Sequence, residues 1–292
     1  MVKEKSDNYN SGVASQTRKP LIVMKIGGNI IDDEEKLSSF LKDFASLNSP
    51  LQEIGAEPLQ RMGAKKILVH GGGKLASKLA AQLNIPQQMI EGRRITDAET
   101  LKVVTMVYAG YINKNIVAQL QAHNCNSVGL TGADGNLIQS HKRSHPTIDY
   151  GFVGDVDITN IQLLENLLEE NITIVVAPIT HDKKGQLLNT NADTIAQEIA
   201  KGLSNLYEVI LVYSFEKNGV LENAADDNTI IKKVDPEIYK DLKQRGAIFA
   251  GMIPKLDNAF IALNNGVKKV IIGKAENINQ LIKGEAGTTI IK

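Results

Sequence analysis

The stretch Leu21-Ile-Val-Met-Lys25-Ile26-Gly27-Gly28 reads as an apolar strand that runs directly into glycines. The stretch Lys66-Ile-Leu-Val-His70-Gly71-Gly72-Gly73 repeats that arrangement, and a helical pattern follows each one. A strand, a glycine turn and a helix N-terminus bring backbone N–H groups and the positive end of a helix dipole to one point, which favours phosphate or carboxylate. Two such units close together in the chain, the first with a lysine on its strand, predict a site where two anionic groups meet.

Strand and helix patterns alternate along most of the chain after Pro20. Continuous apolar runs at residues 172–177, 209–212 and 270–272 are typical of buried parallel strands. Residues 136–158 look like hairpins instead. We therefore expect an α/β fold, a three-layer αβα sandwich with a mostly parallel central sheet. Ligands should bind at the carboxyl ends of its strands.

The composition excludes several classes of protein. Lys and Arg together number 33, as do Asp and Glu, so nothing in the charge favours a nucleic acid or an anionic membrane as partner. No apolar run approaches about 18 residues, so no transmembrane helix is expected. Cys125 is the only cysteine, which excludes a disulfide framework and favours the cytoplasm. Residues 1–20 are polar and predict a disordered leader, native or an expression remnant, rather than a signal peptide.

The glycine turns match neither the P-loop pattern nor the dinucleotide-binding pattern. Four spaced signals are present instead: Lys25-Ile-Gly-Gly28, His70-Gly-Gly-Gly73, Leu188-Asn-Thr-Asn-Ala-Asp193 and Gly251-Met-Ile-Pro-Lys255. In this order and spacing they resemble the amino acid kinase family. The resemblance covers residues 21–292.

Three further stretches resemble the branch of that family that phosphorylates N-acetylglutamate: Arg93-Arg94-Ile95-Thr96, Gly151-Phe-Val-Gly154 and Gly287-Thr288. The resemblance implies a phosphotransferase that moves the γ-phosphate of ATP to the γ-carboxylate of N-acetyl-L-glutamate, in arginine biosynthesis. It implies that residues 21–186 hold the acyl amino acid and residues 187–292 the nucleotide. Mg²⁺ would be carried by the nucleotide, because the sequence offers no dedicated carboxylate cage.

The transfer of a phosphoryl group to a carboxylate brings two anions together, so catalysis depends on positioning and charge neutralisation. By resemblance, Lys25 and Lys255 stabilise the transition state from two sides, and Asp193 completes the catalytic set by holding both lysines. The alternatives are an ordinary surface role for either lysine, and an Asp193 that only complements a helix dipole.

The resemblance also implies which residues bind the acyl amino acid. Arg94 would clamp its α-carboxylate, since a planar bidentate donor suits a planar acceptor. Asn189 would bind the α-carboxylate or the acyl end, and Asn191 would lie beside the reacting groups. Gly72 and Gly73 would offer backbone N–H groups to the same substrate.

For the nucleotide, Gly27 and Gly28 would offer N–H groups to the phosphates beside Lys25 and Lys255. Its further expected neighbours are Gly219, Ala247, Ile248 and Phe249. His70 reads as a packing or hydrogen-bonding residue, because no proton has to be removed from an ionised carboxylate.

One segment departs from the family pattern. Family members usually carry a Thr-Asp or Ser-Asp pair after the strand at residues 209–212. This chain has Tyr213-Ser214 there, no aspartate, and about two additional residues before Gly219-Val220. Ser214 or Glu216 could replace the aspartate, and the sequence does not choose between them.

Other functions stay open. One alternative is a kinase of N-succinylglutamate. Another is an aspartate or glutamate kinase. An appended regulatory or RNA-binding domain would favour that second alternative, and this sequence shows no such domain. A non-catalytic nucleotide or amino-acid sensor is disfavoured, because it would not need the two lysines and Asp193.

By resemblance, arginine-inhibited hexameric relatives carry an amphipathic N-terminal helix. The few apolar residues of the leader form no stripe, so we expect a homodimer insensitive to arginine.

Overall fold

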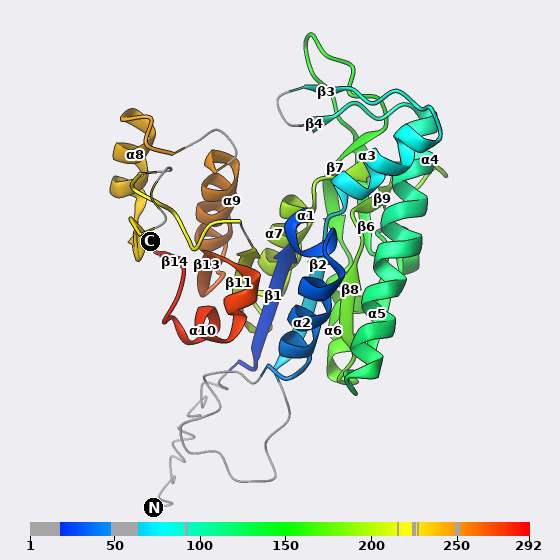
Figure 1. Ribbon diagram of the computed structural model, residues 1–292. Helices are drawn as coiled ribbons and strands as arrows, with labels where there is room; N and C mark the ends of the chain where they lie inside the picture. The colour runs from blue at the N-terminus through cyan, green and yellow to red at the C-terminus, as the bar shows by residue number, and fades with distance from the viewer. Residues whose placement is uncertain are drawn as a thin grey trace, which may run out of the picture.

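An eight-stranded sheet forms the centre of the molecule, in the order β12-β14-β13-β11-β1-β2-β8-β5 (Figure 1). The computed structural model describes residues 18–47, 64–90, 93–214, 216–223, 226, 228–248 and 252–292, so most of the expected leader lies outside it. The strands of the sheet are β1 (Pro20–Ile26), β2 (Lys65–His70), β5 (Ser127–Leu130), β8 (Thr173–Val176), β11 (Glu208–Ser214), β12 (Lys233–Val234), β13 (Lys269–Gly273) and β14 (Thr288–Ile290). All neighbouring pairs are parallel except β13 and β14, which confirms a mostly parallel sheet.

Helices cover both faces of this sheet. Alternate residues of a strand point to opposite faces, so each face presents apolar side chains that a helix layer buries. In β1, Leu21 and Val23 pack on the face covered by α6, α7 and α9, and Ile22 and Met24 pack on the face covered by α2, α5 and α10. The helices are α1 (Gly28–Ile31), α2 (Glu34–Ala45), α3 (Gly73–Gln82), α4 (Ala98–Thr105), α5 (Asn113–Ala122), α6 (Ile161–Glu169), α7 (Ala192–Leu203), α8 (Pro236–Gln244), α9 (Ile253–Asn264) and α10 (Ile278–Lys283). The expected three-layer αβα sandwich is confirmed.

Three helices begin at an aspartate whose side chain caps the helix. The side chains of Asp33, Asp97 and Asp235 accept hydrogen bonds from backbone N–H groups three residues on, as N-caps do. Two apolar side chains that a 3.6-residue helical period would place on a buried face are exposed, Leu83 at 50% and Tyr111 at 58%. Tyr111 lies in a π-helix, Met106–Ile112, between α4 and α5. The wider π turn shifts the helix face out of the 3.6-residue period that we assumed.

A small closed barrel stands beside the sheet. Its strands are β6 (Ile138–Lys142), β7 (Val153–Thr159), β9 (Ile179–His181) and β10 (Leu187–Thr190). Strands β6 and β7 are antiparallel, which confirms the hairpin expected at residues 136–158. The β3 (Met89–Ile90) and β4 (Arg93–Arg94) hairpin has no clear signal in the sequence. Short 3₁₀ turns span Asp134–Asn136 and Ala275–Asn277.

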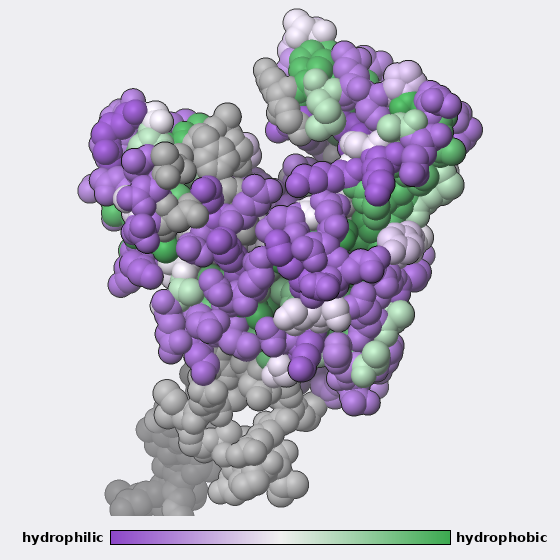
Figure 2. Space-filling view, in the orientation of Figure 1, coloured by the Kyte–Doolittle hydropathy of each residue, from purple (hydrophilic) through white to green (hydrophobic). Residues whose placement is uncertain are grey.

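Strand β1 lies at the point where the connections change direction. Strands β2, β8 and β5 lie on one side of it, and the later strands β11, β13, β14 and β12 lie on the other. Ligand sites of open α/β sheets form at such a point. Figure 2 shows the surface hollowed between the lobe that carries α8 and α9 and the lobe that carries β3 and β4. Within the described residues, no helix is long and apolar enough to cross a membrane.

Candidate active site

Lys25 lies beneath the first turn of α7. The alternation of β1 places its side chain on the same face as Leu21 and Val23, which is the face that α7 covers. Its Nζ atom lies 2.8 Å from Oδ1 of Asp193, and the side chains of the two residues are 13% and 16% exposed. The lysine is therefore paired and largely shielded, unlike an ordinary surface lysine.

Lys255 reaches the same carboxylate from α9, with Nζ 2.7 Å from Asp193 Oδ2. Burial alone would raise the pKa of the Asp193 carboxyl, but the charges and hydrogen bonds of the two lysines outweigh it and lower that pKa far below its usual range. Burial, together with the charge of Lys25, lowers the pKa of Lys255, and Asp193 opposes this. The structure thus brings Lys25, Asp193 and Lys255 into one compact group.

Asn191 fixes the backbone that carries Asp193. It is the N-cap of α7, where its side-chain oxygen accepts hydrogen bonds from the N–H groups of Asp193 (2.8 Å) and Thr194 (3.3 Å). Such a cap satisfies donors that a helix start leaves free. Strand β10 leads directly into this turn, so the barrel and α7 together place the carboxylate.

A cavity of about 440 Å³ lies beside this group, between the lobes. Its walls come from both halves of the chain and comprise Gly73, Met89, Arg93, Arg94, Tyr108, Arg143, Val153, Asn189, Thr190, Asn191, Thr194, Pro254, Asp257 and Asn258. Three of the side chains expected to bind substrate, Arg94, Asn189 and Asn191, thus line one cavity. Its mixture of cationic and amide groups suits a carboxylate-bearing amide.

Arg94 is buried, and its guanidinium is held by three neighbours. It donates to the carbonyl oxygen of Gly73 (2.9 Å), to Oγ of Ser77 (2.9 Å) and to Oε1 of Gln87. Asn189 is fixed similarly, since its Nδ2 donates to Thr96 Oγ1 at 3.0 Å. Side chains held in this way are preorganised for a ligand.

The glycines at the ends of β1 and β2 lie where the sequence expects them. Gly72 has φ +149°, and a Cβ there would lie 2.3 Å from Cδ1 of Ile112, so only glycine fits this turn. Gly27 is the N-cap of α1, and its Cβ position lies 3.7 Å from the Lys25 Nζ atom. Gly28 follows as the first residue of that helix.

On the expected nucleotide side, Gly219 is buried against Thr288, whose Oγ1 lies 2.6 Å from where a Cβ would sit. Ile248 packs in the hydrophobic core, with Ala247 partly buried beside it. Phe249 lies outside the described residues. A nucleotide role for these positions stays a prediction.

The choice between Ser214 and Glu216 also stays open. Ser214 is buried at the end of β11, and its hydroxyl has no hydrogen-bond partner among the described residues, whereas Glu216 is exposed.

His70 is fully buried and hydrogen-bonded. Its Nδ1 lies 2.9 Å from the Gly71 carbonyl oxygen, and its Nε2 lies 3.2 Å from Nδ2 of Asn113. One neutral tautomer, with the proton on Nδ1, satisfies both contacts. Burial lowers the pKa of His70 to about 4, so the ring is neutral at pH 7. This geometry agrees with a packing and hydrogen-bonding role.

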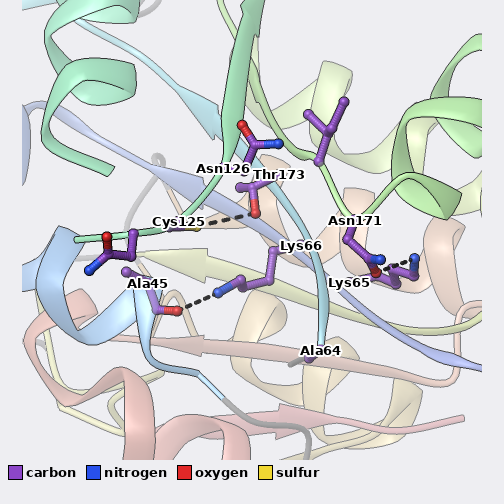
Figure 3. A pocket seen from close by; sticks show the side chains of 10 residues that line it. Ala45, Ala64, Lys65, Lys66, Cys125, Asn126, Asn171 and Thr173 are labelled. Atoms are coloured by element: carbon purple, nitrogen blue, oxygen red, sulfur yellow. Dashed lines mark hydrogen bonds between the residues drawn. The ribbon is translucent and has the colours of Figure 1, made fainter. Parts of the chain in front are cut away.

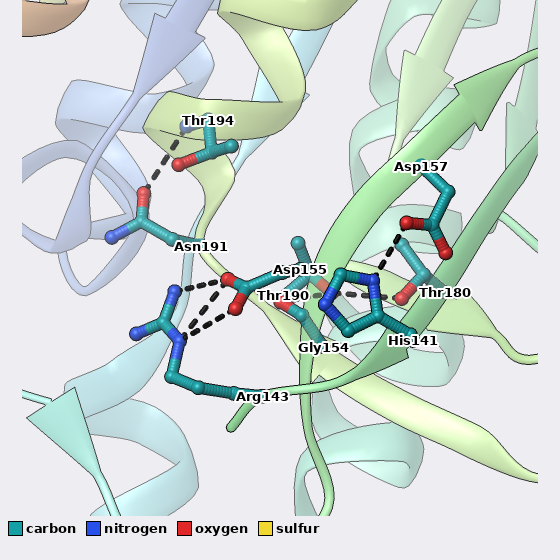
Figure 4. Close-up of polar contacts among 9 residues, drawn as sticks. All are labelled: His141, Arg143, Gly154, Asp155, Asp157, Thr180, Thr190, Asn191 and Thr194. Atoms are coloured by element: carbon teal, nitrogen blue, oxygen red, sulfur yellow. Dashed lines mark hydrogen bonds and ion pairs between the residues drawn. The ribbon is translucent and has the colours of Figure 1, made fainter. Parts of the chain in front are cut away.

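Tyr108 and Arg143 are among the residues of the cavity that sequence reasoning missed. Tyr108 comes from the π-helix, and no local signal marks that insertion. Arg143 follows β6 and donates from Nε to both carboxylate oxygens of Asp155, each at 3.1 Å (Figure 4). The hairpin pairing of β6 with β7 brings the side chains of Arg143 and Asp155 together.

A second cavity, of about 310 Å³, lies at the amino ends of β2, β5 and β8, away from the glycine turns (Figure 3). Lys66 is buried there and donates to the carbonyl oxygens of Phe44 (3.0 Å) and Ala45 (2.7 Å) at the end of α2. A lysine that satisfies free helix carbonyls has a sufficient structural role. Among the described residues, no three His, Cys, Asp or Glu side chains gather into a possible metal site.

Comparison with known proteins shows the family of this chain. The model of the amino acid kinase family matches residues 20–274. This chain belongs to the amino acid kinase family. It is 54% identical to an acetylglutamate kinase from Cytophaga hutchinsonii over 90% of this chain and 94% of that protein. It is 52% identical to an acetylglutamate kinase from Parabacteroides distasonis over 89% of this chain and 96% of that protein.

A solved structure has the same fold at lower identity. The N-acetylglutamate synthase from Neisseria gonorrhoeae, complexed with coenzyme A and N-acetyl-glutamate, superposes with a TM-score of 0.77 at 20% identity. The match covers 95% of this chain and 60% of the synthase. It confirms the amino acid kinase fold.

Proposed function

We propose that this kinase transfers the γ-phosphate of ATP to the γ-carboxylate of N-acetyl-L-glutamate, a step of arginine biosynthesis that gives an acyl phosphate. One observation carries the proposal: two lysines converge on Asp193 beside a cavity that a buried Arg94 lines. Relatives about half identical over nearly the whole chain are named acetylglutamate kinase, which supports it.

In this proposal the cavity holds the acyl amino acid. Arg94 binds the α-carboxylate, Asn189 supports that carboxylate or the acyl end, and Asn191 lies by the reacting groups. The N–H groups of Gly72 and Gly73 face the same substrate.

The γ-carboxylate oxygen attacks the γ-phosphorus in line. The new O–P bond forms as the bond to the β–γ bridging oxygen breaks, and ADP leaves. The carboxylate is already ionised at pH 7, so no general base is needed.

The lysines supply positive charge where the reaction concentrates negative charge. Lys25 and Lys255 lie on two sides of Asp193, and we propose that they neutralise the transferred group and the leaving oxygen. Asp193 offsets their mutual repulsion and fixes both ammonium groups before substrates arrive.

The family implies ATP with Mg²⁺. Mg²⁺ would add charge neutralisation while held mainly by phosphate oxygens and water. We propose that Gly27 and Gly28 receive the phosphates, with Gly219 and residues 247–249 nearby. The division into an acyl lobe (residues 21–186) and a nucleotide lobe (residues 187–292), a cytoplasmic location and a homodimer remain predictions.

Trapping the product with hydroxylamine tests the function. With Mg-ATP and N-acetylglutamate, we expect a hydroxamate and stoichiometric ADP. N-succinylglutamate, glutamate and aspartate, assayed in parallel, should give lower kcat/KM. A higher kcat/KM for any of these would reassign the substrate, and ATP binding without turnover of any acceptor would indicate a sensor instead.

A further inference from the structure

Tyr213 is the residue at which the chain departs from the Thr or Ser that the family resemblance leads one to expect. It lies in β11 opposite Lys25 of β1 in the parallel register, and its side chain is fully buried. Tyr213 packs in the same core cluster as Leu211 and Val209, on the face of the sheet that α7 covers. A large aromatic side chain therefore lies under the charged group described above.

Two contacts join Tyr213 to that group. Its hydroxyl donates to the backbone carbonyl oxygen of Asp193 at 3.3 Å. Its ring lies beneath the Lys255 ammonium, with Nζ 5.9 Å from the ring centroid. Burial and the nearby charges of Asp193 and Glu198 raise the pKa of Tyr213 well above its usual value, so the hydroxyl stays protonated and able to donate.

We propose that Tyr213 is a positioning residue of the phosphoryl-transfer centre: its ring fixes the Lys255 ammonium, and its hydroxyl fixes the turn that carries Asp193. The proposal rests on the proposed function. It assigns to Tyr213 no contact with either substrate.

The need for such a residue follows from the charges. Lys25 and Lys255 repel each other, and Asp193 offers one oxygen to each of them. A single ion pair leaves a long lysine side chain free to swing about it. The negative face of an aromatic ring adds a second attraction from another direction, which is strengthened where water is excluded. Lys255 is then held from two sides before the phosphates arrive.

The sharpest test reduces the negative charge on the faces of the ring and changes its shape little. Phenylalanine replaces Tyr213, and further variants carry one, two or three ring fluorines at the same position. We expect kcat to fall stepwise along the series, to about one tenth of the Tyr213→Phe value with three fluorines. KM for both substrates should change less than about twofold, because the ring positions a transition-state group. An unchanged kcat along the series would overturn the proposal.

Two further variants separate positioning from packing. Tyr213→Leu removes the ring and should lose about tenfold or more in kcat, with Tyr213→Phe restoring most of it. The matched control is Phe40→Leu, since Phe40 of α2 is equally buried but packs on the opposite face of the sheet. It should lower the melting temperature and leave kcat unchanged. Equal kcat losses at both positions would indicate a packing effect and overturn the proposal.

A measurement without turnover keeps this test separate from the proposed function. NMR of labelled lysine side chains gives the pKa of Lys255 in the free protein, where Asp193, Lys25 and the Tyr213 ring surround its ammonium. We expect a lower pKa in the trifluoro variant than in Tyr213→Phe, because a weaker ring favours the charged form less. If the wild type forms no acyl phosphate, the function fails, and this pKa difference alone decides whether Tyr213 holds Lys255. No difference would refute that contact.

Discussion

The Nζ atom of Lys255 lies 2.7 Å from Oδ2 of Asp193, although the two residues are 62 positions apart in the chain. The contact joins the first turns of α7 and α9 above the central sheet. With Lys25 on the other carboxylate oxygen, it creates a site with two cations and one anion. One positive charge of this group exceeds the negative charge of Asp193, and in the proposed function a phosphoryl group in transfer would balance it.

Arg94→Lys should raise the KM for N-acetylglutamate about tenfold or more, or at least about 1.4 kcal/mol, because lysine cannot reproduce a planar bidentate contact. The KM for ATP should change much less. Steady-state kinetics measures both constants. Arg93→Lys is the control, since Arg93 is exposed at the same cavity and should change KM less than about threefold. An unchanged KM in Arg94→Lys would remove Arg94 from the substrate site.

Gly72→Ala should weaken both the fold and substrate binding. The added Cβ would lie 2.3 Å from Ile112 and require a backbone conformation that alanine rarely adopts. We expect a loss of about 1–3 kcal/mol in the free energy of unfolding. Gly110→Ala is the control, because nothing lies within 4 Å of its Cβ position. Thermal melts that show equal losses for both variants would contradict the tight packing of Gly72.

His70 should make the protein less stable in acid without acting in catalysis. Its pKa is lowered from 6.5 to about 4 by burial, so between these values the unfolded chain binds a proton that the folded chain does not. The free energy of unfolding therefore falls as pH drops through this window, by about 1.4 kcal/mol per pH unit.

Urea unfolding of the wild type and His70→Gln across this window measures the difference. The variant should be less stable at pH 7 but should lack this part of the pH dependence. Parallel curves for the two proteins would contradict a neutral buried histidine.

The assembly should be a homodimer that arginine does not inhibit. The sequence at residues 1–20 has scattered apolar residues without a helical stripe, unlike the interlocking helix of hexameric relatives. Sedimentation velocity gives the oligomeric state, and kinetics with millimolar arginine tests the inhibition. A hexamer, or a shift in KM with arginine, would contradict this expectation.

The sequence predicts the layers of the fold because buried parallel strands leave continuous apolar runs, as at residues 172–177 and 209–212. The pairing of Lys25 and Lys255 with Asp193 is expected from the family resemblance, and the structure brings the three side chains together. Helix starts at Asp33 and Asp97 follow from local capping, and Pro236 marks the start of α8. The layers and the helix starts depend on local chemistry or on strand periodicity.

What the sequence could not predict depends on packing between distant segments. The π-helix that places Tyr108 in the cavity has no local signature. Arg143 reaches the cavity through the register of β6 with β7. Tyr213 meets Lys255 only because α9 packs beside α7 on the face of the sheet to which Tyr213 points. The contact of Tyr213 with Lys255, which sequence reasoning could not anticipate, thus lies in the segment that departs from the family pattern.

Asp193→Asn tests the central claim most directly, because asparagine keeps the shape and removes the charge between the two lysines. Steady-state kinetics with N-acetylglutamate and ATP should show kcat lowered by about 10²-fold, or about 2.7 kcal/mol of barrier, with both KM values little changed. Asp235→Asn, at the N-cap of α8, is the control and should affect stability alone. A near-normal kcat in Asp193→Asn, with only a lower melting temperature, would contradict the account and reduce Asp193 to a helix-terminal aspartate.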